Sequence, residues 1–172
     1  WGYGFAVVDP AVPEEGIRAS SPTRLVELLA ERKALAARRK IKGGVILAAD
    51  TVVALEARVF GKPLDVPHAA EILRALSGKA HAVITGICVM DARSGKAAIS
   101  HAVSHLRMKP LTEKEIGEYI ASGEPMGKAG AYAIQETGDR WVTLEEGSRT
   151  NVVGLPEELV RPMLEAAGVV PG

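Results

Sequence analysis

The chain of 172 residues has a single cysteine, no net charge and no long apolar run. Each of these absences argues against one class of protein to which the chain could belong. Cys88 sits in a very apolar stretch, so we expect a reduced core thiol in a cytoplasmic protein. No apolar run is long enough to span a bilayer, and no signal peptide is visible. We therefore expect no membrane partner.

The charges balance, with 21 lysines and arginines against 21 aspartates and glutamates. No overall field draws the chain to a nucleic acid polymer, which argues against a general DNA-binding protein but leaves room for a small basic pocket. The sequence also has no Gly-rich P-loop, no dinucleotide-binding fingerprint and no nucleophile elbow. A hydrolytic triad is therefore not supported.

Strand and helix patterns alternate along the chain, which predicts one α/β or α+β domain over residues 1–172. The first predicted helix starts at the cap Ser21-Pro22 and carries one apolar stripe. Arg32 falls within that stripe and Lys33 at its edge. The stripe consists of Leu25, Leu28, Leu29, Leu35 and Ala36. Strands are expected at 5–8, 45–55, 80–90, 96–108 and 141–144, and further helices begin near 65, 112 and 156.

Two charged residues, Asp50 and Lys62, stand close together in the sequence after the apolar run that begins at residue 45. Asp50 comes at the end of an apolar run, where we expect a strand to end, and Lys62 stands between Gly61 and Pro63. A carboxylate binds a hard divalent cation and a lysine offers a point charge to phosphate, so the pair is suited to a metal-phosphate group. The simpler alternative is that Asp50 is a turn residue.

Two further polar residues stand where packing does not require them, Glu14 in a loop and Gln135 after the small-residue run 128–134. Small residues let the backbone come close to a ligand or, more commonly, to a neighbouring element. His101 and His105 share one face of a predicted strand and could bind zinc, but no third ligand lies nearby. We therefore do not favour a zinc site.

Together these stretches resemble the Maf family of nucleoside triphosphate pyrophosphatases. The resemblance runs over nearly the whole chain, and its Ala-Asp-Thr, Gly-Lys-Pro and Lys-Ala-Gly-Ala-Tyr motifs are specific in combination. The matching pieces are residues 5–8 leading to Glu14, 29–34, 49–53, 61–63, 76–78, 85–86, 123–125, 128–135 and 153–156.

The resemblance implies a mixed α/β fold like that of inosine triphosphate pyrophosphatases, with an elongated sheet, flanking helices and a central cleft. It also implies that water attacks the α-phosphorus of a nucleoside triphosphate and releases pyrophosphate. Asp50 would be the proton acceptor and Glu14 the second acid, and both would hold a divalent cation, Mg²⁺ or Mn²⁺. Lys33 and Lys62 match the family's phosphate-binding lysines.

The resemblance extends to substrate choice. Thr51 and Gln135 match the subgroup that acts on dTTP and UTP, and Lys128 belongs to the same substrate-binding stretch. A glutamine amide both donates and accepts hydrogen bonds, which suits a pyrimidine edge. Family membership implies a homodimer. The alternatives are a 7-methyl-GTP or other modified-nucleotide pyrophosphatase, and a non-catalytic nucleotide-binding regulator of cell division and septum formation.

The sequence departs from the family pattern at two places. The family opens with a strand and a Ser-x-Ser-Pro-Arg-Arg phosphate motif, whereas Trp1 already matches the segment after that motif. We therefore expect these 172 residues to lack the first strand and the basic loop, either because the true N-terminus is missing from the sequence or because the protein has lost its phosphate loop. Residues 20–24 look similar to that motif but lie after Glu14, and we interpret them as a helix cap. The second departure is Gly127, where the family usually has an aspartate.

Overall fold

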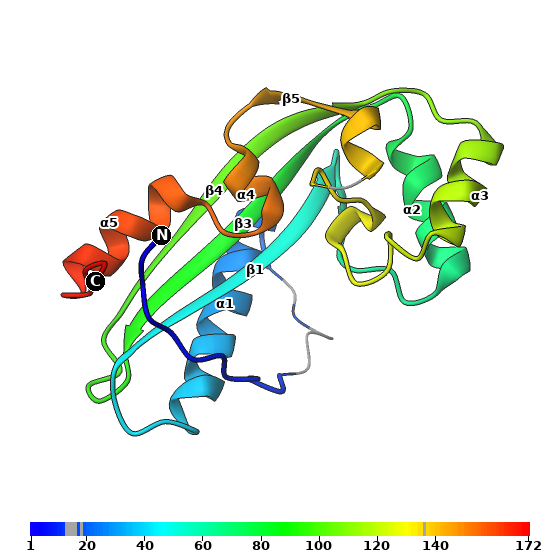
Figure 1. The fold of residues 1–172 in the computed structure, drawn as a ribbon. Helices are drawn as coiled ribbons and strands as arrows, with labels where there is room; N and C mark the ends of the chain where they lie inside the picture. The colour runs from blue at the N-terminus through cyan, green and yellow to red at the C-terminus, as the bar shows by residue number, and fades with distance from the viewer. Residues whose placement is uncertain (13–16, 18, 136) are drawn as a thin grey trace. The chain divides into compact units, whose positions relative to one another are not determined.

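The structure, a computed structural model, describes residues 1–12, 17, 19–135 and 137–172. One five-stranded sheet has the order β2-β1-β3-β4-β5, and helices flank it, which confirms the α/β class (Figure 1). The elements in chain order are α1 Pro22–Arg38, β1 Val45–Leu55, β2 Arg58–Phe60, α2 Val66–Leu76, β3 Ala80–Asp91, β4 Ala97–Met108, α3 Glu113–Ala121, the short 3₁₀ helices η1 Ala129–Ala131 and η2 Thr137–Trp141, β5 Val142–Glu146, α4 Arg149–Val153 and α5 Glu157–Ala166.

Neighbouring strands run antiparallel. β1 pairs with β2 and β4 with β5 in this direction, with Val53 opposite Phe60 and Met108 opposite Val142. A tight turn joins β3 to β4, in which the Asp91 N–H donates to the carbonyl of Lys96. The chain divides into two compact units. The first unit holds residues 1–50, 85–102 and 155–172, and the second unit holds residues 51–84 and 103–154.

In the first unit β3 is buried on both faces. Cys88 and Met90 belong to the apolar cluster that packs against α1, whereas Ile87 and Val89 belong to the cluster that packs against α5. Because successive side chains of a strand point to opposite faces, a strand covered on both sides must be apolar at every position. The continuous apolar run of residues 80–90 is explained by this double burial.

The buried face of α1 differs from the predicted leucine stripe. Leu35 is 42% exposed, while Val26, Ala30 and Ala34 are fully buried. The reason is the close approach of α1 to β3, since a Cβ added at Gly86 would lie only 2.3 Å from the carbonyl oxygen of Val26. Backbones this close leave room for alanine rather than leucine. Counting positions 26, 30, 33, 34 and 37 along α1 places Lys33 within this face.

The second unit has its own core. α2 contributes Ile72 and Leu73, and α3 contributes Tyr119, whose ring meets Trp141 edge to face at 4.6 Å between centroids. The predicted helix starts are confirmed here, because the Asp65 carboxylate accepts from the His68 N–H at 2.8 Å and caps α2. α3 follows the predicted start near residue 112, where Thr112 and Glu115 form a capping box.

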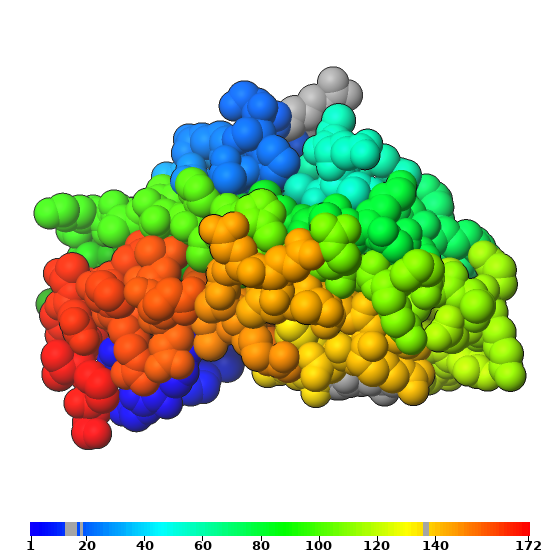
Figure 2. All heavy atoms as spheres, turned by 90° about the horizontal axis from the view of Figure 1, so that it is seen from above, coloured from blue at the N-terminus to red at the C-terminus, as the bar shows by residue number. Residues whose placement is uncertain are grey.

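Residues 5–8 do not form the predicted strand. They carry no helix or strand, and Phe5 and Val7 are 86% and 87% exposed. The start of the chain lies beside α5, as the blue and red atoms show in Figure 2, with the Gly172 N–H donating to the carbonyl of Gly2. β-propensity alone does not make a strand, because a strand requires hydrogen bonds to a neighbour.

Among the residues that the structure describes, no helix is long and apolar enough to cross a membrane.

The close packing of α1 on β3 predicts opposite effects for two glycine-to-alanine changes. Gly86→Ala places a methyl group against the Val26 carbonyl and should lower the free energy of unfolding by about 1–3 kcal/mol. Gly117 lies in α3 with no atom near its added Cβ, so Gly117→Ala should raise it by up to about 1 kcal/mol. Urea unfolding of both variants measures the difference, and a Gly86→Ala protein as stable as the parent would contradict the close approach.

Candidate active site

β1 confirms the strand predicted over residues 45–55, and Asp50 lies in its middle, not at the end of a strand as the preceding apolar run suggested. Its side chain is 7% exposed and lies on the same face of β1 as Ile46, which packs against α1. The two apolar runs around Asp50 are therefore one continuous strand that carries a carboxylate on its buried face. A charge in such a place requires a partner.

Lys33 is that partner. Its ammonium group donates a hydrogen bond to the Asp50 carboxylate and forms an ion pair with it, and its side chain is 18% exposed. The α-helical register explains the contact, because Lys33 stands one turn from Ala30 and Ala37 on the face that packs on the sheet. The structure thus joins two residues that the sequence assigned to one site across a separation of 17 positions.

Glu14, the predicted second acid, lies outside the described residues. In the part of the chain that the structure describes, no three histidine, cysteine, aspartate or glutamate side chains come together as a metal site. Mg²⁺ is commonly held by one or two carboxylates together with substrate phosphates. Asp50 fits that pattern as a single carboxylate ligand.

In the second unit the turn that carries Lys62 is tied to the segment that carries Lys128. The Gly130 N–H donates to the carbonyl of Gly61 at 3.0 Å. Gly130 has φ 71° and Ala131 φ 59°, and a Cβ at Gly130 would lie 2.5 Å from the Val53 side chain. The small residues here are thus required by a neighbouring strand, the commoner of the two alternatives. Lys62 itself is exposed.

A buried histidine holds the same segment. His81 Nε2 lies 2.7 Å from the Tyr132 hydroxyl, and both residues are about 95% buried, at 4% and 5% exposure. Burial lowers the pKa of His81, so the ring is neutral. With Nδ1–H directed at the carbonyl of Lys79, Nε2 is the acceptor and the tyrosine O–H donates. Nothing in the local sequence distinguishes His81, since its partner lies 51 positions away.

Gln135 is exposed and follows directly on Ile134, whose side chain is buried in the second unit's core. The Arg149 guanidinium donates to the Ile134 carbonyl at 2.8 Å and forms an ion pair with Asp139 at 3.1 Å. Arg149 did not stand out in the sequence, because nothing local distinguishes it from other surface arginines.

The remaining predicted substrate residue, Thr51, lies against Gly154, whose added Cβ would be 3.1 Å from the Thr51 hydroxyl oxygen.

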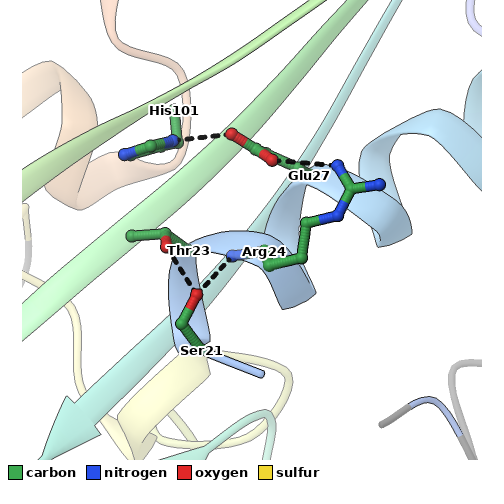
Figure 3. Close-up of polar contacts among 5 residues, drawn as sticks. All are labelled: Ser21, Thr23, Arg24, Glu27 and His101. Atoms are coloured by element: carbon green, nitrogen blue, oxygen red, sulfur yellow. Dashed lines mark hydrogen bonds and ion pairs between the residues drawn. The ribbon is translucent and has the colours of Figure 1, made fainter. Parts of the chain in front are cut away.

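The predicted cap at Ser21 is confirmed in the first turn of α1. The same part of α1 carries Glu27, which binds His101, one of the two histidines considered for a zinc site. The Ser21 hydroxyl accepts from the Arg24 N–H at 3.1 Å, as Figure 3 shows. His101 Nδ1 lies 2.8 Å from the Glu27 carboxylate, which also binds Arg24. The hydrogen bond that His101 donates to Glu27 lowers the pKa of this carboxyl group. His101 and His105 do share the exposed face of β4.

A family model described as Maf-like protein matches residues 1–167. The chain belongs to the Maf-like protein family. Three relatives that carry the name dTTP/UTP pyrophosphatase are similar over most of their length. The protein of Pelotomaculum thermopropionicum is 44% identical over 167 residues, which cover 97% of this chain and 87% of the relative. Those of Syntrophotalea carbinolica and Anaeromyxobacter sp. are 43% and 44% identical and cover 98% and 94% of this chain and 78% of each relative.

This Maf-like protein therefore carries its predicted site residues in two groups. The first unit holds Lys33 paired with Asp50. The second unit holds the other predicted residues, Thr51, Lys62, Lys128 and Gln135. Gly127, where the family usually has aspartate, has φ 77° and is exposed. Aspartate is one of the few side chains that tolerate this conformation, so the backbone suits either residue.

The buried ion pair predicts that removing Lys33 alone lowers the free energy of unfolding more than removing both charges. Lys33→Met removes the cation that binds the buried Asp50 carboxylate and should lower the free energy of unfolding by about 3 kcal/mol. Adding Asp50→Asn removes the buried charge, so the double variant should be more stable than Lys33→Met alone. Chemical unfolding of the parent, of Lys33→Met, of Asp50→Asn and of the double variant measures this order. Additive losses in the double variant would contradict it.

The lowered pKa of His81 predicts a pH dependence of stability. Below pH 6.5 the unfolded imidazole takes up a proton that the buried ring resists, so the free energy of unfolding falls as the pH falls. Tyr132, the Lys79 carbonyl and the charge of Glu145 are the groups that act on this ring. His81→Gln keeps an acceptor for Tyr132 and removes the titration, so its stability should fall less between pH 6.5 and about pH 5. Equal slopes in urea unfolding would refute the neutral ring.

Proposed function

We propose that this Maf-like protein hydrolyses dTTP and UTP to nucleoside monophosphate and pyrophosphate. The observation that carries the proposal is the buried ion pair of Lys33 and Asp50. The packing of the core does not require these two charges, whereas the proposed reaction requires both. Support also comes from the relatives at 39–44% identity that are named dTTP/UTP pyrophosphatase.

In the proposed reaction water attacks the α-phosphorus. A bond forms between the water oxygen and phosphorus, the bond from phosphorus to the bridging oxygen of pyrophosphate breaks, and the proton of the water passes to a carboxylate oxygen of Asp50. The Lys33 ammonium stabilises the negative charge of that carboxylate before the reaction. Lys62 and Lys33 would offset charge that builds on the phosphate oxygens in the transition state.

The proposal includes a divalent cation, Mg²⁺ or Mn²⁺, held by Asp50 together with Glu14. Such an ion would neutralise phosphate charge when bound. Thr51, Lys128 and Gln135 bind the nucleotide, with the amide of Gln135 directed at the edge of the base. A cytoplasmic homodimer that removes non-standard nucleotides completes the proposal.

The test is pyrophosphate release from dTTP, UTP, CTP and 7-methyl-GTP with Mg²⁺ or Mn²⁺. It uses this chain and a version extended at its N-terminus by the first strand and Ser-x-Ser-Pro-Arg-Arg motif of the family. We expect turnover of dTTP and UTP, and a loss of about 10²- to 10⁴-fold in Asp50→Asn, because the proton acceptor is gone.

Glu71→Gln is the matched control, since Glu71 is an exposed carboxylate paired only with Arg58 among the contacts described here. It should keep full activity. Preference for 7-methyl-GTP would instead assign the protein to modified purine nucleotides. Nucleotide binding without turnover in either version would favour the regulator of cell division.

A further inference from the structure

Four residues of the segment 128–134, which leads to Gln135, are held by hydrogen bonds from other parts of the chain. Gly130 donates its N–H to the carbonyl of Gly61, and the Tyr132 hydroxyl binds His81 of β3. The Ala133 N–H donates to the Tyr119 hydroxyl of α3 at 3.2 Å. All of these residues belong to the second unit. A chain held this closely presents its next side chain in a defined direction.

Arg149 supplies the last of these contacts, at the peptide bond that leads into Gln135. Its Nη2 nitrogen lies 2.8 Å from the Ile134 carbonyl oxygen. That oxygen belongs to the planar unit that also contains the Gln135 N–H, so holding the oxygen fixes the orientation of the whole plane. Because the Ile134 side chain is buried at 2% exposure, the residue before the plane is fixed as well. The direction in which Gln135 leaves the backbone follows from both.

Arg149 is itself placed by a rigid support. It is the first residue of α4, which the Ser148 hydroxyl caps by accepting from the Asn151 N–H at 3.1 Å. The Asn151 amide is 1% exposed and donates to the carbonyl of Val83 and to the Ser104 hydroxyl. The Asp139 carboxylate meets the same Nη2 at 3.1 Å. An exposed ion pair contributes little energy by itself, so its effect here is to orient the guanidinium.

We propose that Arg149 is a positioning residue that sets nucleobase selectivity by holding the Ile134–Gln135 peptide unit. The inference rests on the proposed function, in which Gln135 contacts the base. Arg149 acts through Gln135 and not on the phosphates. Loss of its hydrogen bond lets the peptide unit rotate and weakens the discrimination between uracil and cytosine, whose edges differ in donors and acceptors.

A direct phosphate contact by Arg149 would leave a different kinetic signature. All nucleoside triphosphates carry the same phosphates, so loss of such a contact would lower kcat/KM equally for every substrate. Loss of a positioning residue changes the ratio of kcat/KM between UTP and CTP. General unfolding lowers the active fraction and leaves that ratio unchanged.

The experiment measures kcat/KM for UTP and CTP in both chain versions described above. Arg149→Met keeps the length of the side chain without its donors and should lower the UTP to CTP ratio by about tenfold, the size expected for one lost hydrogen bond to the base. Arg149→Lys keeps one cationic donor and should restore part of the ratio. Arg107→Met is the control, because Arg107 is equally exposed at 56% and its described contact is a side-chain ion pair with Glu145.

A double-mutant cycle tests whether Arg149 acts through Gln135. Gln135→Ala should lower the same ratio, and adding Arg149→Met should lower it no further. Multiplied effects in the double variant, or an unchanged ratio in Arg149→Met, overturn the inference while the proposed function stands. An unmutated protein that releases no pyrophosphate from UTP overturns the proposed function and the inference with it.

Discussion

The close approach of α1 to β3 is the constraint on which the first unit depends. At Gly86 the strand has no side chain, and the backbone of α1 at Val26 occupies the space that a Cβ would need. This contact sets which face of α1 is buried, and the buried positions are small because the distance is short. Two turns further along that face stands Lys33, and its ammonium group meets the carboxylate that β1 presents toward α1. The candidate catalytic pair is thus a consequence of how closely a helix lies on a sheet.

A buried ion pair contributes little net stability to a protein. Two charges lose their hydration, and an apolar pair of similar volume commonly stabilises a core as well or better. Alanines surround Lys33 on its own helix, and α1 would pack on the sheet with another apolar side chain at that position. The cost is understandable if both groups act on a substrate, because a phosphate needs the cation and a water molecule needs the base.

In the second unit, hydrogen bonds from other parts of the chain fix an irregular segment in one conformation. Residues 128–135 contain two successive positions with positive φ, at Gly130 and Ala131, and lack a strand ladder to fix them. Hydrogen bonds from a turn, a buried histidine, a tyrosine and an arginine replace the ladder. Preorganisation of this kind matters for recognition, because a contact to a ligand discriminates only when its donor is already in place. The Maf-like fold thus provides a fixed carboxylate in one unit and a fixed amide-bearing segment in the other.

The sequence by itself determined the strands β1, β3, β4 and β5, the helices α1, α2, α3 and α5 with the caps of the first three, and the family. These follow from local patterns, since periodicity and capping act over a few residues. It also pointed to Asp50, Lys33, Lys62 and Gln135 through motifs. Only the tertiary structure decided which face of α1 is buried, that residues 5–8 do not form a strand, and that the Asp50 carboxylate meets Lys33. It alone decided that His81 and Arg149 support the segment before Gln135, because their partners lie 51 and 15 positions away and such contacts leave no trace in local sequence.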